Sequence, residues 1–160
     1  MREILFRGNK EYNGKWVEGS LCTTLPSDEG FYTISYFDCE GYYIEERVCP
    51  ETIGQYTGLT DKNGKKIFEG DIVQYLACGD FDCQSIVKFG EYRQDGSGGE
   101  YGGRKCIGFY VEVDNFTCPD WCEDDPEYFP DYARQQNILE VFSECEVIGN
   151  IYDNPELIGE

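Results

Sequence analysis

Two close pairs of cysteines are the residues whose type and spacing could hold a metal ion. Cys78 and Cys83 flank four residues, and Cys118 and Cys122 flank three. Four thiolates could bind Zn²⁺ tetrahedrally, but neither pair has the two-residue spacing of a zinc knuckle, and the chain has no His to serve as a ligand. The alternative is that all four are plain thiols on variable loops. The sequence leaves both interpretations open, and we expect no cofactor.

Nucleophilic catalysis normally needs a general base, and His is the usual one. The chain contains no His, which excludes Cys-His and Ser-His-Asp machinery. Paired carboxylates remain conceivable, because 32 of the 160 residues are Asp or Glu. That abundance makes any single pair uninformative. We therefore expect a protein that is not an enzyme.

Two stretches rich in Gly and Lys invite comparison with a phosphate-binding loop. A Walker A loop reads G-x-x-x-x-G-K followed by Ser or Thr, so that backbone N–H groups, the Lys and the hydroxyl converge on phosphates and Mg²⁺. "GLTDKNGKK" (58–66) has neither that spacing nor the hydroxyl, and "GSGGEYGGRK" (96–105) precedes a predicted strand instead of a helix. Neither stretch is expected to bind a nucleotide.

The overall charge argues against direct contact with nucleic acid or with anionic membranes. The formal net charge is −19, and a chain of that sign is repelled by phosphate-rich surfaces. The one basic cluster consists of Lys62, Lys65 and Lys66, and acidic residues surround it. We expect no direct nucleic-acid binding, and the acidity itself favours solubility.

The densest acidic stretch is the candidate interaction surface. Residues 118–132 contain six acids, three Pro and no base. Closely spaced carboxylates can imitate the phosphates of duplex DNA, and aromatic residues among them can anchor a protein interface. The bland alternative is a solvated acidic loop. The residues of the candidate surface are Asp120, Trp121, Glu123, Asp124, Asp125, Glu127 and Tyr128.

The elements that must position these residues are predicted to be strands. Thirteen Tyr and ten Phe favour strands, whereas nineteen Gly and only two Ala disfavour long helices. An Asn-Gly turn at 13–14 predicts a hairpin over 3–22, and Gly41 allows a second between 31–37 and 42–48. Further strands are predicted over 71–77, 83–90, 106–113 and 146–153, a loop over 91–103, and one short helix over 133–142.

The stretch "QYTGLTDKNGKKIFEGDIV" (55–73) is predicted to turn the chain and to carry no chemistry. Gly58, Gly64 and Gly70 stand where the chain is expected to bend. Asp and Asn side chains bond to their own backbone in turns, as Asp61 and the Asn at position 63 are expected to do. The stretch is therefore interpreted as a tight loop that feeds a strand whose core residues are Ile72 and Val73.

The compartment is predicted from what the chain lacks. The first residues, "MREILFRGNKE", hold too short an apolar run for a secretion signal, and no apolar run approaches the roughly 20 residues of a membrane span. We expect a cytoplasmic protein, in which the nine cysteines are mostly thiols. Their odd number also prevents complete pairing within one chain.

Three separated motifs resemble the YopX family, whose members are found mainly in bacteriophages and prophages. They are "MREILFRG" with the Trp and Gly that follow it, "ETIGQYTGLTDKNGKKIFEGDIV" (51–73) and "EVIGNIYDNPEL" (146–157). The resemblance implies a mainly β fold with an SH3-like barrel, hairpin additions and one short helix near the C-terminus. It implies one domain over 1–160, with a possible β subdomain over 1–50 and a barrel over 51–160 that carries an insertion at about 91–132. It implies no reaction, because the family has no established activity.

Together these features predict a small acidic phage or prophage protein that acts in the cytoplasm of a bacterial host. Its expected role is non-catalytic protein binding or assembly, and self-association is plausible because edge strands can pair between copies. The alternative is an acidic decoy that imitates DNA and engages a host nucleic-acid-binding protein.

Overall fold

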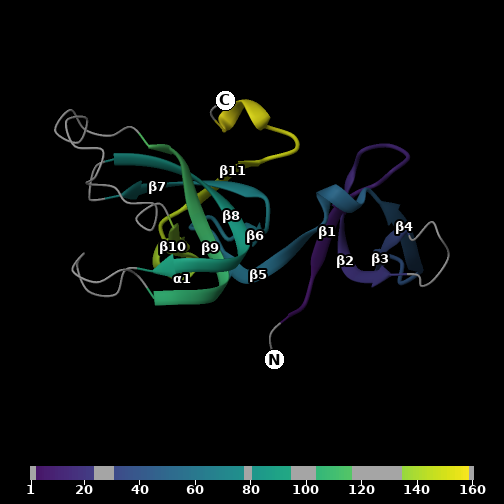
Figure 1. Ribbon diagram of the computed structural model, residues 1–160. Helices are drawn as coiled ribbons and strands as arrows, with labels where there is room; N and C mark the ends of the chain where they lie inside the picture. The colour runs from purple at the N-terminus through teal and green to yellow at the C-terminus, as the bar shows by residue number, and fades with distance from the viewer. Residues whose placement is uncertain (1–2, 24–30, 78–80, 95–103, 117–134, 159–160) are drawn as a thin grey trace. The chain divides into compact units, whose positions relative to one another are not determined.

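The structure is a computed structural model that describes residues 3–23, 31–77, 81–94, 104–116 and 135–158. The chain divides into two compact units, 1–58 and 59–160. The strands and short helices, drawn in Figure 1, are β1 (Phe6–Asn9), β2 (Trp16–Thr23), β3 (Tyr32–Phe37), β4 (Tyr43–Val48), η1 (Pro50–Thr52), β5 (Gly54–Thr60), β6 (Lys66–Phe68), β7 (Asp71–Ala77), β8 (Phe81–Gln94), β9 (Arg104–Phe116), β10 (Gln135–Asn137), α1 (Ile138–Val141), β11 (Glu146–Asn150) and η3 (Pro155–Leu157).

The first unit is built from the two predicted hairpins. β1 pairs antiparallel with β2, and β3 with β4, while β2 and β3 join the hairpins into one sheet. Gly14 and Gly41 adopt φ of 65° and 87° at the two turns, the left-handed region that a side chain disfavours. Both hairpin predictions are therefore confirmed.

A close approach between strands shapes the core of this unit. Val17, Ile34 and Val48 form a buried cluster, and the end of β4 returns to the end of β1 through an isolated bridge between Lys10 and Val48. A β-carbon at Gly19 would collide with the carbonyl oxygen of Ser35 and would lie 2.9 Å from Ile34 Cγ2. Glycine at this position is what lets the backbone of β3 come so close.

The second unit is organised around a five-stranded antiparallel sheet in the order β10-β9-β8-β7-β11. Its centre is the long β8–β9 hairpin, visible in Figure 1. One face of the sheet is buried: Val73 and Tyr75 of β7, Val87 of β8 and Val111 of β9 pack with residues of α1. β5 runs from the first unit into the second, where β6 neighbours it.

The expectation of a mainly β fold is confirmed, but the expected barrel does not close over the described strands. β11 pairs with β7 alone and β10 with β9 alone, so the five-stranded sheet ends at two separate edges.

The helix expected over 133–142 is limited, in the described part of that range, to the single turn α1 (Ile138–Val141). Gln135, Gln136 and Asn137 form β10 instead. The single turn α1 is capped by the Asn137 side chain, which accepts the backbone N–H of Leu139. Pairing with the edge of β9 outweighs the weak helical tendency of this polar stretch. Among the described residues, no helix has the length and apolarity needed to traverse a membrane.

Candidate functional site

The loop between β5 and β6 is held by one carboxylate. Asp61 Oδ1 accepts the backbone N–H of Asn63 at 2.8 Å and that of Lys65 at 2.9 Å. The Asn-Gly pair at 63–64 completes the turn, and Gly64 has a φ of 82°. This is the local turn that the sequence predicted, because a short acidic side chain reaches the amides that follow it.

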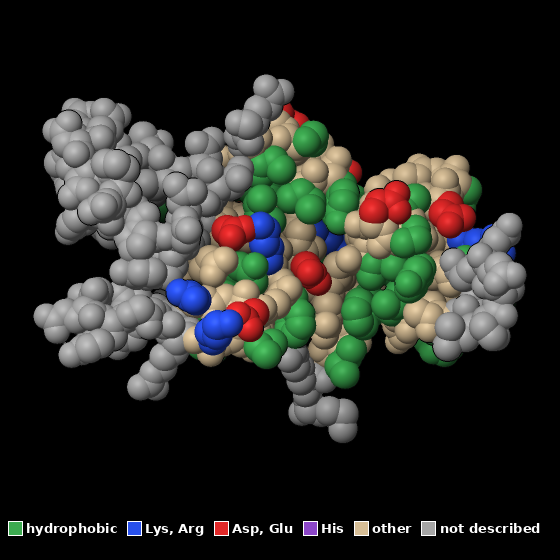
Figure 2. Space-filling model, in the orientation of Figure 1, with side chains coloured by type: hydrophobic (Ala, Val, Ile, Leu, Met, Phe, Trp, Pro, Cys, Tyr) green, Lys and Arg blue, Asp and Glu red, His purple; other side chains and the backbone are tan. Residues whose placement is uncertain are grey.

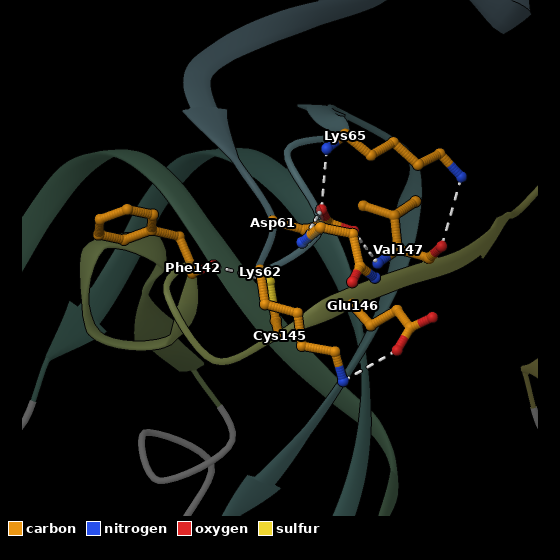
Figure 3. A network of polar contacts seen from close by, with 8 residues as sticks. Asp61, Lys62, Lys65, Phe142, Cys145, Glu146 and Val147 are labelled. Carbon is orange, nitrogen blue, oxygen red and sulfur yellow. Dashed lines mark hydrogen bonds and ion pairs between the residues drawn. The ribbon is translucent and has the colours of Figure 1, made fainter.

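The same loop is joined to β11 by contacts that sequence spacing does not reveal. Figure 3 shows the network. The second carboxylate oxygen of Asp61 accepts the N–H of Val147 at 3.0 Å. Lys65 Nζ donates to the carbonyl of Val147 at 3.3 Å, and the backbone N–H of Lys62 donates to the carbonyl of Cys145 at 3.0 Å. We call these contacts the loop–β11 clasp. It brings together two of the three family-like motifs.

The clasp determines the protonation of Asp61. Burial, with 5% of the residue exposed, acts to raise the pKa of its carboxyl group. The hydrogen bonds from the backbone of Val147, Lys65 and Asn63 and the charge of Lys65 outweigh burial, so the pKa lies below its ordinary value. Hydrogen bonds donated to a carboxylate favour its charged form. Asp61 is thus a buried carboxylate that joins the loop to β11.

A small cavity of about 360 Å³ lies beside the clasp, and we call it the β7–β11 pocket. Its volume is at the lower end of the range for ligand sites. Gln74 and Glu146 are direct cross-strand partners on β7 and β11. The lining residues are Lys62, Gln74, Tyr75, Leu76, Glu144 and Glu146.

The charges of the β7–β11 pocket are unequal. Lys62 Nζ lies 2.9 Å from Glu146 Oε2, and the charge of Glu146 raises the pKa of Lys62 through their hydrogen bond. Glu144 is exposed in the turn before β11 and has no ion pair with any described residue. The lining therefore carries one cation that is already paired and a second carboxylate that is not.

The titratable groups under this pocket are poor nucleophiles. Burial raises the pKa of Tyr75 to about 12, although its hydroxyl lies 3.2 Å from Ser85 Oγ. Burial and the nearby charge of Asp61 raise the pKa of Cys145 to about 11. A thiol with such a pKa is almost entirely protonated at neutral pH.

Aromatic side chains are exposed at the turn of the β3–β4 hairpin. Phe37 and Tyr43 are directly paired across the strands, are 71% and 58% exposed, and meet edge to face with ring centroids 5.8 Å apart. Tyr42 beside them is also exposed. We call Phe37, Tyr42 and Tyr43 the aromatic tip. Hydrophobic side chains also reach the visible surface of both units (Figure 2).

The residues predicted to form an interaction surface, Asp120, Trp121, Glu123, Asp124, Asp125, Glu127 and Tyr128, all lie outside the described residues, as do Cys78, Cys118 and Cys122. Cys83, the fourth candidate zinc ligand, is buried in the core of the second unit. Over the described ranges, no three or more Cys, Asp or Glu side chains gather as a metal site.

The structure places two residues of the lysine cluster, Lys62 and Lys65, in the loop–β11 clasp and the third, Lys66, at the start of β6. Lys62 and Lys65 are engaged with Glu146 and with the Val147 carbonyl. The sequence predicted the loop but neither the clasp nor the β7–β11 pocket. Pocket residues come from positions 62, 74–76, 144 and 146, and no spacing rule connects segments so far apart.

Comparison with known proteins gives a family and a structural likeness. The family model described as "YopX protein" matches residues 5–159. The crystal structure of protein EF1440 from Enterococcus faecalis is similar at 23% identity and a TM-score of 0.44, over 99% of this chain and 100% of that one. No curated protein matches the chain.

Proposed function

The chain belongs to the YopX family, and on that premise we propose that it is a non-catalytic module that binds a protein partner or takes part in assembly. The observation that carries the proposal is the aromatic tip. Large aromatic side chains that stay exposed in a cluster are enriched at protein interfaces. Phe37 is 71% exposed, and transfer of its ring from water into an apolar interface lowers the free energy.

The turn beneath the aromatic tip supports this role because it is already ordered. Asp38 Oδ1 accepts the backbone N–H groups of Glu40 and Tyr42, each at 2.9 Å. Gly41 supplies the positive φ that the turn needs. A binding surface that is ordered before its partner arrives loses less entropy on association.

The absence of His and the burial of two thiols support a non-catalytic role. The sequence has no His, so the most common general base is missing. The two buried described thiols, Cys83 and Cys145, are shielded from substrates. We propose accordingly that neither a cofactor nor a catalytic metal is required.

The biological setting belongs to the same proposal. We place the protein in a phage or prophage and in the bacterial cytoplasm, as its family resemblance and its sequence suggest. The SH3-like label stays a prediction for the second unit. We also propose that the protein forms homo-oligomers. Light scattering at micromolar concentration tests this, and a monomer mass would contradict it.

Capture from host-cell lysate tests the proposal when it is tied to the aromatic tip. The wild-type chain, a Phe37→Ala/Tyr43→Ala double variant and a Tyr12→Ala control are each used as bait. Tyr12 is a suitable control because it is 68% exposed in the other hairpin turn of the same unit. A partner recovered by the wild type and the control but lost by the double variant supports the proposal. Equal recovery by all three, or no partner at all, contradicts it.

The acidic decoy is the second candidate, and the net charge of −19 favours it. A decoy engages its target through many phosphate-like charges, so its binding weakens steeply with salt. Recovery of a basic DNA-binding protein that is released by a modest rise in salt would support this role. A partner that withstands the same rise would support the aromatic tip instead.

A further inference from the structure

We propose that the β7–β11 pocket receives the side chain of an arginine from a protein partner. This inference rests on the proposed function, because it names the chemistry of one contact that a binding module makes. It concerns the second unit and is independent of the aromatic tip in the first. Glu144, Leu76 and Gln74 are the residues that carry it.

Charge selects a cation as the occupant. The lining holds Lys62, Glu144 and Glu146, and Lys62 is already paired with Glu146 at 2.9 Å. Glu144 is thus the lining carboxylate that has no paired cation among the described residues. An anionic ligand would have to displace Glu146 from Lys62 and would approach a chain with a net charge of −19. A cationic ligand meets attraction on both counts.

The apolar part of the lining fits a charged group that arrives on an aliphatic stem. Leu76 is 56% exposed and lies next to Tyr75 at the same pocket. Arg covers apolar surface with its methylene groups while its head group remains in a polar environment. Gln74 lines the same pocket, and the side-chain oxygen of a Gln can accept a further guanidinium N–H.

Arginine fits better than lysine because of its head group. A guanidinium presents several N–H donors in one plane and binds a carboxylate through two parallel hydrogen bonds. An ammonium is a more strongly hydrated point charge. In a small open pocket, loss of that hydration is poorly compensated. We therefore expect arginine to be preferred.

The test uses the full chain, labelled with ¹⁵N, and two short probes. One probe is the capped tripeptide acetyl-Gly-Arg-Gly-amide, and the other carries citrulline, which has nearly the same shape but no charge, in place of Arg. Titrations are followed by backbone chemical shifts. The Arg probe is expected to shift Gln74, Leu76 and Glu144, and the citrulline probe is expected to bind at least tenfold more weakly.

Two matched variants locate the contact. Glu144→Gln is expected to weaken binding of the Arg probe about tenfold, since a charge-assisted pair is lost. Glu40→Gln removes one exposed carboxylate in the first unit and is expected to leave the affinity unchanged. Equal binding of the two probes, equal loss in the two variants, shifts confined to other residues, or no binding at millimolar probe would each overturn the inference.

These outcomes are separable from the fate of the proposed function. Failure of the Arg probe leaves partner capture through the aromatic tip intact. A lysate that yields no partner, together with an Arg probe that binds at Glu144, would retain the pocket and remove the proposed role of the tip.

Discussion

Asp61 and Val147 are joined by a hydrogen bond of 3.0 Å although 86 positions separate them in sequence. The bond fixes the first residues of β11 to a loop that the same carboxylate has already closed. One buried side chain thus holds both a local turn and a distant edge strand. Substitution of Asp61 can measure what the hydrogen bonds of its carboxylate contribute to stability.

Replacing Asp61 with Asn should loosen β11 selectively. In Asp61→Asn, the remaining oxygen can still accept the Asn63 and Lys65 amides, but an NH₂ group then faces the N–H of Val147. Loss of a charge-assisted bond and the clash of two donors are expected to lower the opening free energy of β11 by about 2 kcal/mol. Native-state hydrogen exchange at Val147 and Val73 measures it.

The matched control for that change is Asp38→Asn. Asp38 closes a similar turn with two backbone bonds, at Glu40 and Tyr42, but makes no remote third bond that the structure describes. The backbone amides of Glu40 and Tyr42 are exposed, so in Asp38→Asn they can form hydrogen bonds with water. The free energy lost in this variant should therefore be clearly smaller. An effect of Asp38→Asn as large as that of Asp61→Asn would mean that the remote bond contributes little.

The stability of the second unit should also depend on pH through Asp61. The pKa of the Asp61 carboxyl group is lowered in the folded chain. As the pH falls, the unfolded chain is therefore protonated at this group before the folded chain is. The stability that the Asp61 carboxylate contributes is fully present above the ordinary carboxyl pKa of about 4. It is lost as the pH falls through the lower pKa of this group in the folded chain. The difference in β11 protection between the wild type and Asp61→Asn should therefore shrink below about pH 4. A difference that stays constant to pH 2 would be inconsistent with this.

A methyl group at position 19 should destabilise the first unit. In Gly19→Ala, the new β-carbon would meet the Ser35 carbonyl and Ile34, and relief requires a shift of backbone. We expect a loss of about 1–3 kcal/mol, measured by denaturant unfolding followed through the indole of Trp16. Gly108→Ala serves as the control, because a β-carbon there meets no atom within 4 Å. Equal stability of the two variants would show that β2 and β3 separate at little cost.

The thiols should differ widely in reactivity. Cys39 is exposed, whereas Cys83 and Cys145 are buried, and the pKa of Cys145 is raised to about 11. With iodoacetamide at neutral pH, Cys39 should be alkylated in the native protein, and Cys145 only after unfolding, since the thiolate is the reactive form. Peptide mass spectrometry reads both sites. Rapid native labelling of Cys145 would mean that the core around it opens readily.

The hairpins were predictable because their signals are local. The Asn13-Gly14 turn and Gly41 stand beside the strands that they connect, and both lie at positive φ. The same holds for Ile72 and Val73, which are fully buried as expected. In each case the turn residue or the strand residue itself carries the information.

The remaining features depend on contacts between distant segments. Glu146 pairs with Gln74 across the β7–β11 ladder, and nothing near either residue indicates the other. Gln135–Asn137 resembles the start of a helix until an edge of β9 is available to pair with it. The β7–β11 pocket arises where the β7–β11 ladder lies beside the loop of Lys62, so residue type and spacing could not predict it.

The position of β11 in the order of synthesis has a consequence for how the protein matures. β7 is made early, yet its outer edge has no described partner until residues 146–150 emerge. Until then, the Asp61 carboxylate lacks the Val147 amide, and a nascent chain exposes a free strand edge that can pair with another chain. The second unit should therefore reach its final sheet only after residues 146–150 have been made, with the highest risk of mispairing just before.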